Sequence, residues 1–198
     1  MTLEFHAATH TYRLDGRSVP SVTEVLKPLY SFDGIPADVM ETARVRGSWI
    51  HAAVDLYNRG VLDVATVSED VKPYLANWLR FLDESRAIVT AGEMRVASRK
   101  YGYAGTLDTL CEMPLGETLV DVKATAIMPR PVGPQTAGYA QAIMEETGAK
   151  KHLRRLCVHL QPGKYRVELL NDSADFTTFL SCLNVNVYNR KFGAHRAA

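Results

Sequence analysis

Residues 101–123 read YGYAGTLDTLCEMPLGETLVDVK, and this stretch decides the fold. Apolar and β-branched residues dominate both halves of it, on either side of the turn-like segment PLGE at residues 114–117. This pattern predicts two strands, 101–113 and 118–123, joined by a tight turn. Consecutive strands joined in this way pair antiparallel, so the sequence predicts a hairpin in the middle of the chain.

The second strand of this hairpin places a carboxylate and an ammonium group on one face. Side chains alternate along a strand, so Asp121 and Lys123 point the same way while Val120 and Val122 point into a core. Taken alone, such a pair is better explained as a surface ion pair of little energetic value. Antiparallel pairing, however, brings Asp108 near Asp121. Two carboxylates repel unless a positive charge lies between them, and such oxygen ligands suit Mg²⁺ or Mn²⁺.

Periodicity and turn signals predict the remaining elements outward from this hairpin. They are a β-hairpin over 9–22 around Asp15-Gly16, helices over 38–58 and about 71–82, a strand over 87–97, a helix over 135–147, strands over 153–160 and 164–170, and a C-terminal helix over about 173–190. The central order of helix, three strands, helix and strand predicts an α/β (α+β) fold with a mixed sheet flanked by helices. We expect one domain over 1–198, with its core at about 41–170.

Composition narrows the class of protein. The chain has 198 residues, of which 46% are hydrophobic and 23% charged, as in ordinary globular domains. No run of about 18 apolar residues predicts a membrane span, and the N-terminus lacks the pattern of a signal peptide. Cys111, Cys157 and Cys182 are widely spaced and form no CxxC motif, so we expect buried thiols in a reducing cytoplasm, of a bacterial cell or a phage-infected host.

Charge is distributed unevenly along the chain. The net charge of +1 divides into −4 over residues 1–120 and +5 over residues 121–198. A basic half is typical of proteins that bind polyanions, although chance imbalance on a solvated surface explains it as well. The candidate contacts to a nucleic-acid backbone are Arg44, Arg46, Arg130, Lys150, Lys151, Arg154 and Arg155.

Four sequence motifs in a fixed order resemble those of the PD-(D/E)XK nuclease superfamily, in particular its RecB-like and lambda-exonuclease-like branch. They are Gly47 with His51 on a helix, Asp108 on a strand, Asp121-Val122-Lys123 on the next strand, and Gln135 with Tyr139 on the following helix. The resemblance covers roughly residues 44–160. It implies a restriction-endonuclease-like core in the order αβββαβ.

The resemblance also implies a role for each of these residues. Asp108 and Asp121, with His51 and the Val122 carbonyl, would hold one or two Mg²⁺ or Mn²⁺ ions. Lys123 would act beside the attacking water, and Gln135 and Tyr139 would border the active site. Gly47 would let its helix approach the sheet closely, and Asp55 would orient the imidazole of His51. Without the resemblance, the histidine is explained as a surface residue and the Gln135–Tyr139 pair as ordinary packing.

Glu93 is a further metal-ligand candidate, on the strand over 87–97. Some members of the superfamily carry an acidic residue there, but a solvated strand residue explains it equally well. The cysteine spacing predicts no iron–sulfur cluster, and no nucleotide-binding motif is present.

The activity expected from these residues is hydrolysis of DNA. The short chain, without a helicase-like P-loop, resembles phage-type exonucleases of recombination, repair or replication. Such proteins often work with a strand-annealing partner and form homo-oligomers. A structure-specific endonuclease and a non-catalytic nucleic-acid-binding or assembly module remain the alternatives.

Overall fold

The computed structural model describes residues 2–30, 34–125, 131–148 and 153–192. Its strands are β1 (Leu3–His6), β2 (Thr11–Leu14), β3 (Arg17–Val19), β4 (Ile88–Ser98), β5 (Tyr103–Met113), β6 (Gly116–Lys123), β7 (Arg154–Gln161) and β8 (Lys164–Leu169). Its α-helices are α1 (Val22–Val25), α2 (Ala37–Asn58), α3 (Lys72–Ser85), α4 (Val132–Thr147) and α5 (Asp175–Phe192). Three short 3₁₀ turns are η1 (Ala7–Thr9), η2 (Lys27–Leu29) and η3 (Val64–Thr66).

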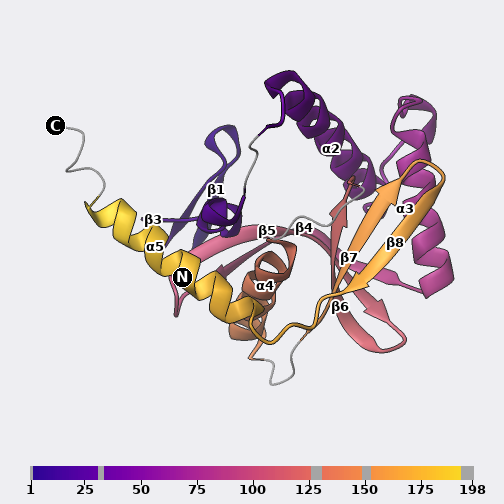
Figure 1. Ribbon diagram of the computed structural model, residues 1–198. Coiled ribbons are helices and arrows are strands. Elements are labelled where there is room, and N and C mark those ends of the chain that lie inside the picture. The colour runs from indigo at the N-terminus through magenta and orange to yellow at the C-terminus, as the bar shows by residue number, and fades with distance from the viewer. Residues whose placement is uncertain (1, 31–33, 126–130, 149–152, 193–198) are drawn as a thin grey trace.

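A mixed five-stranded sheet forms the centre of the molecule (Figure 1). Its strands lie in the order β4-β5-β6-β7-β8, and every neighbouring pair is antiparallel except β6 and β7. A parallel pair needs a crossover connection, and α4 provides it. The predicted α/β fold, with a mixed sheet between helices, an N-terminal hairpin and a C-terminal helix, is confirmed.

Helices cover both faces of this sheet. On one face α2 and α3 bury Ile50, Trp78 and Phe81 against Val120 and Val122. On the other face α1, α4 and α5 form a second apolar cluster with the sheet, which the following residues contribute: Val22, Val96, Leu107, Leu119, Ile143 and Phe179. Val120 and Val122 therefore point into a core, as predicted, while Leu119, Asp121 and Lys123 belong to the face that α4 covers.

The N-terminal segment forms a separate three-stranded sheet, β1-β2-β3. Asp15 and Gly16 connect β2 to β3 and both have positive φ, the backbone of a type I′ turn, so the predicted hairpin is confirmed. Its predicted end at residue 22 is wrong, because Ser21 caps α1 by accepting a hydrogen bond from the Glu24 N–H at 3.0 Å. Strand β1 has no counterpart in the predictions.

The predicted helix limits agree with the structure to within two residues except at two places, the end of α3, which continues to Ser85, and the start of α4, and the short helix α1 was not predicted. Residues 132–134 looked like a loop because they follow a Pro/Gly-rich stretch, yet they form the first turn of this helix. Pro134 is tolerated there, since the first turn of a helix has no intrahelical partner for its N–H groups. The three cysteines are buried on β5, β7 and α5. None of the helices described is both long and apolar enough to cross a membrane.

Candidate active site

The β5–β6 hairpin opens where the candidate carboxylates lie. The paired register of the two strands ends at Thr109 and Val120. Beyond this point Asp108 Oδ2 accepts a hydrogen bond from the Val122 N–H at 2.8 Å, so a carboxylate replaces the next bond of the ladder. This bond fixes Asp108 beside the strand that carries Asp121, as the pairing of the two strands predicted.

Asp121 and Lys123 form a close ion pair on the face that α4 covers. Lys123 Nζ lies 2.6 Å from Asp121 Oδ2, and Asp121 is only 2% exposed. Among the described residues, the Lys123 ammonium is the charge partner of this buried oxygen. A buried carboxylate oxygen costs free energy unless a cation neutralises it. The pair is therefore not the surface ion pair that was the alternative interpretation.

His51, Glu93 and Asp108 come together next to this pair. One ligand atom from each lies within 4.8 Å of the others, and His51 Nδ1 is 3.5 Å from Asp108 Oδ1. Gly92 and Met94 pair with Thr109 and Leu107, which places Glu93 opposite Asp108 on the neighbouring strand. Magnesium binds oxygen ligands at about 2.0–2.1 Å, so ligand atoms on opposite sides of one ion are about 4.2 Å apart. The spacing of this cluster fits one divalent cation.

Burial and mutual charge shift the ionisation of the whole group. Burial is the largest influence on the pKa of Asp108, but the charges of His51 and Lys123 outweigh it and the pKa falls well below its ordinary value. Burial raises the pKa of Asp121 to about 6, with Asp108 adding to the rise and Lys123 opposing it. The charge of Asp108 raises the pKa of His51. Two neighbouring carboxylates with opposite pKa shifts are typical of functional sites.

Gln135 and Tyr139 lie on the α4 face that borders this group. The Gln135 side chain hydrogen-bonds to the Tyr139 hydroxyl, while burial and the charges of Asp108 and Asp121 raise the pKa of Tyr139. Gly105 on β5 makes room for the tyrosine ring, because a Cβ at this position would lie 2.6 Å from Tyr139 Cε1. Gln135 and Tyr139 therefore border the cavity of the candidate site, as the resemblance implied.

Two residues near His51 do not behave as the resemblance implied. Gly47 was expected to allow a close approach of helix and sheet, but a Cβ there would meet nothing within 4 Å, so this expectation is wrong. Asp55 was expected to orient the imidazole; instead its Oδ2 pairs with Arg59 Nη2 at 2.7 Å. The partner that lies beside the His51 ring is Asp108.

The candidate backbone-binding arginines are scattered. Arg44 donates to Glu41 at 2.6 and 2.8 Å on the exposed side of α2. Arg46 lines a hollow of about 670 Å³ between α2 and α3 that also contains Glu69 and Asp70. Arg130, Lys150 and Lys151 lie outside the described residues.

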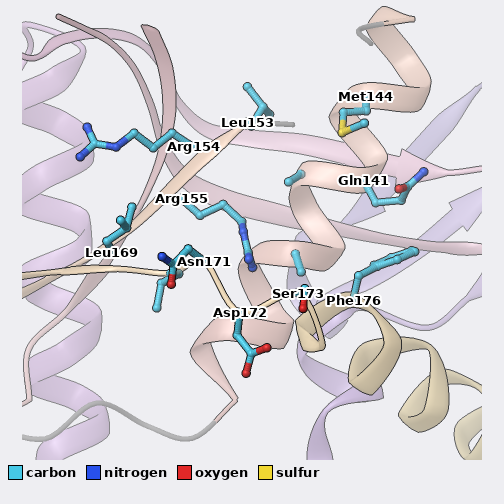
Figure 2. Close-up of a pocket in the computed structure, with 13 residues that line it drawn as sticks. Gln141, Met144, Leu153, Arg154, Arg155, Leu169, Asn171, Asp172, Ser173 and Phe176 are labelled. Carbon is cyan, nitrogen blue, oxygen red and sulfur yellow. The ribbon is translucent and has the colours of Figure 1, made fainter. Parts of the chain in front are cut away.

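Arg154 and Arg155 leave β7 in different directions (Figure 2). Arg155 reaches α4, where its Nη1 donates to the Gly133 carbonyl at 2.8 Å and lies 3.0 Å from Asp175 Oδ2. Because both charged groups are almost completely buried, Arg155 ties β7 to α4 and α5. Arg154 lines the neighbouring cavity of about 460 Å³.

The cavity of the candidate site has a wall that the sequence motifs did not reveal. This cavity of about 260 Å³ contains His51, Glu93, Asp108, Lys123, Gln135 and Tyr139, and its other side is formed by His10, Tyr12, Ser21 and Thr23 of the N-terminal segment. Only the Asp15-Gly16 turn stood out in that segment. Its docking depends on long-range contacts, among them the bond between Tyr12 Oη and Thr106 Oγ1 at 2.7 Å.

Comparison with known proteins supports the fold. No protein-family model and no curated protein sequence matches the chain. Among solved structures, a protein of Eubacterium rectale that is named as a candidate exonuclease matches with a TM-score of 0.52 and 13% sequence identity. The match covers 73% of this chain and 65% of that protein, so the chain spans less than two thirds of its length. The chain thus has the fold of this protein, and the resemblance predicted from the motifs is confirmed at the level of the fold.

Two further matches involve the alkaline exonuclease LHK-Exo of Laribacter hongkongensis. One structure matches with a TM-score of 0.41 and 14% identity over 90% of this chain and 94% of that one. The structure with bound dAMP matches with a TM-score of 0.42 and 15% identity over 91% and 95%. Both TM-scores are below 0.5, so the shared fold rests on the Eubacterium protein.

Proposed function

We propose that this chain is a metal-dependent deoxyribonuclease that hydrolyses phosphodiester bonds at DNA ends. The observation that carries the proposal is the constellation of Asp108 and Lys123 beside His51 and Glu93 in one cavity, with the buried Asp121 paired to Lys123. The fold shared with a protein named as a candidate exonuclease supports the same activity, although fold alone does not determine function.

The residues present fit a divalent cation, Mg²⁺ or Mn²⁺. Asp108, His51 and Glu93 offer ligand atoms at a suitable spacing, and the buried Asp121 carboxylate, paired with Lys123, interacts with Asp108. We include the Val122 carbonyl in this set as a prediction. When bound, such an ion supplies a water of lowered pKa and stabilises the charge that develops on the phosphate.

The protein's own groups then orient and balance the reaction. The charges of Asp121 and Asp108 outweigh the effect of burial and raise the pKa of Lys123, so this side chain is a permanent cation at neutral pH. An ammonium group in this position can orient the attacking water by hydrogen bonding and offset developing negative charge. Gln135 holds the hydroxyl of Tyr139 at the same cavity, where the two can position Lys123 or a phosphate oxygen.

Digestion of linear and covalently closed duplex DNA tests this proposal, with Mg²⁺, with Mn²⁺ and with EDTA. We expect metal-dependent loss of the linear DNA only, absent in Lys123→Ala. Lys100→Ala is the matched control, because Lys100 is exposed and lies outside the cavity. Nicking of the circular DNA would identify the activity as that of an endonuclease instead of an exonuclease. DNA binding without any cleavage would favour the non-catalytic module.

The proposal also includes a biological role and binding partners. The motifs favour a role in phage-type recombination, repair or replication, with a strand-annealing protein as partner and a homo-oligomer as the working form. Arg44, Arg46 and Arg154 stay as predicted DNA contacts, whereas the charge of Arg155 is already balanced by Asp175.

A further inference from the structure

The cavity has two chemically different walls. The wall formed by the central sheet and α2 carries Glu93 and Asp108, the acidic residues of the cavity lining, together with Lys123. The opposite wall, from the N-terminal segment, contributes the imidazole of His10 and the hydroxyl groups of Tyr12 and Thr23. Every one of these groups can donate a hydrogen bond, and none is acidic. The proposed reaction uses no group of this second wall.

The backbone of His10 adopts a conformation that favours glycine. Its φ of 48° and ψ of 45° lie in the left-handed region, where a side chain is normally a disadvantage. Four non-glycine residues of the described chain have positive φ, and two of them, His10 and Glu93, line this cavity. Such residues cluster at functional sites, so a histidine here suggests that its side chain is needed.

The ring of His10 is held in place without using its nitrogens. It packs at nearly right angles against Phe5 and Tyr12, with centroid distances of 5.1 and 5.8 Å. Tyr12 is itself fixed by Thr106, two residues before Asp108 on β5. His10 is exposed, and within the described parts of the chain no hydrogen bond or ion pair involves its ring. A ring with unpaired nitrogens is therefore held in advance at the edge of the cavity.

We propose that His10 binds a non-reacting phosphate of the DNA backbone, next to the phosphate that is cleaved. A phosphodiester offers only acceptor oxygens, and a wall of donors opposite the carboxylates complements it. This inference rests on the proposed nuclease function and assigns the N-terminal sheet a part in holding the substrate strand. Because the contact exists before and during the reaction, its loss raises KM and leaves kcat unchanged.

The test compares variants that accept the left-handed backbone. His10→Gly removes the imidazole and relieves the backbone, so we expect an unchanged or higher Tm. We also expect KM to rise about tenfold. The Kd of a fluorescent oligonucleotide, measured with Mg²⁺ in a Lys123→Ala background, should rise by about the same factor. His10→Asn tolerates the same backbone and restores a donor, so it should recover most of the affinity. His6→Ala, exposed on β1 and outside the cavity, should match wild type.

The possible outcomes separate this inference from the function on which it rests. If wild type cleaves DNA and His10→Gly has the same KM and Kd, the substrate contact is refuted and the nuclease stands. A fall in kcat at constant KM refutes it too, because the residue would then act in the reaction. If wild type neither binds nor cleaves DNA, both proposals fail.

Discussion

The exchange of Asp121 for asparagine isolates the electrostatic cost of the buried Asp121 carboxylate. Burial raises the pKa of this carboxyl from 3.8 to about 6, which corresponds to about 3 kcal/mol against its charged form at neutral pH. The attraction of Lys123 is already included in that value. Asparagine keeps the shape and removes the charge, so metal-free Asp121→Asn should be at least as stable as wild type at pH 7.5.

The stability of the metal-free wild type should fall with rising pH. The folded protein holds the Asp121 proton more tightly than the unfolded chain does, so wild type without metal loses stability as the pH rises from about 4 through 6. The variant should lack this loss. The lowered pKa of Asp108 acts in the opposite direction and in another window, because its contribution is lost only as the pH falls below about 4.

Metal binding should make wild type more stable than Asp121→Asn. A ligand at a hundred times its Kd stabilises a protein by about 2.7 kcal/mol, and for a chain of this size that raises Tm by about 5–10 °C. We expect this rise for wild type with Mn²⁺ at pH 7.5 and little for Asp121→Asn. Glu117→Gln, at an exposed position of the same strand, is the control.

Thermal unfolding between pH 5 and 8, with EDTA or Mn²⁺, measures these effects of pH and metal on Tm. The proteins compared are wild type, Asp121→Asn and Glu117→Gln. An equal rise of Tm with metal in wild type and variant would refute Asp121 as a ligand. A metal-free variant that melts well below wild type would refute the electrostatic reasoning.

Three other substitutions test parts of the fold around the site. Gly105→Ala should displace the Tyr139 ring, lowering both activity and Tm, because the added Cβ would lie 2.6 Å from that ring and overpacking costs about 1–3 kcal/mol. Gly47→Ala should stabilise α2 by about 1 kcal/mol, seen as a higher Tm, since the added methyl group meets nothing within 4 Å; a lower Tm would contradict the open surroundings. Asp175→Asn leaves the Arg155 charge buried without its partner and should cost about 3–5 kcal/mol in denaturant unfolding, much of it recovered when Arg155→Met is added; equal stability of wild type and the single variant would show that the pair is not needed.

Most of the fold was predictable because its signals are local. The Asp15-Gly16 turn and the periodicity of α2 and α3 depend on neighbours in sequence, and these elements are where they were expected. The start of α4 was missed because Gly133 and its flanking prolines resemble a loop. The glycine has a tertiary reason that local patterns do not show, since a Cβ at Gly133 would lie 2.4 Å from the Asp175 carboxylate of α5.

The same distinction between local and long-range signals applies to the residues of the site. Asp108, Asp121 and Lys123 were predictable because a single hairpin carries them. The contribution of His10 depends on the docking of a second sheet against β5, through the Ala104 N–H that donates to the Pro20 carbonyl at 3.1 Å. No spacing in the sequence encodes that contact.

The parallel pairing of β6 and β7 has a consequence for how the protein folds. Because α4 connects β6 to β7, these two strands can pair only after the helix has packed across the sheet. The β5–β6 hairpin, which carries Asp108 and Asp121, needs only a short loop to close. Contacts between residues distant in sequence form slowly, and His51 and Tyr139 join the site only through such contacts. We therefore expect φ-values near zero for these two residues in the folding transition state. A bound cation would then slow unfolding while leaving the folding rate almost unchanged.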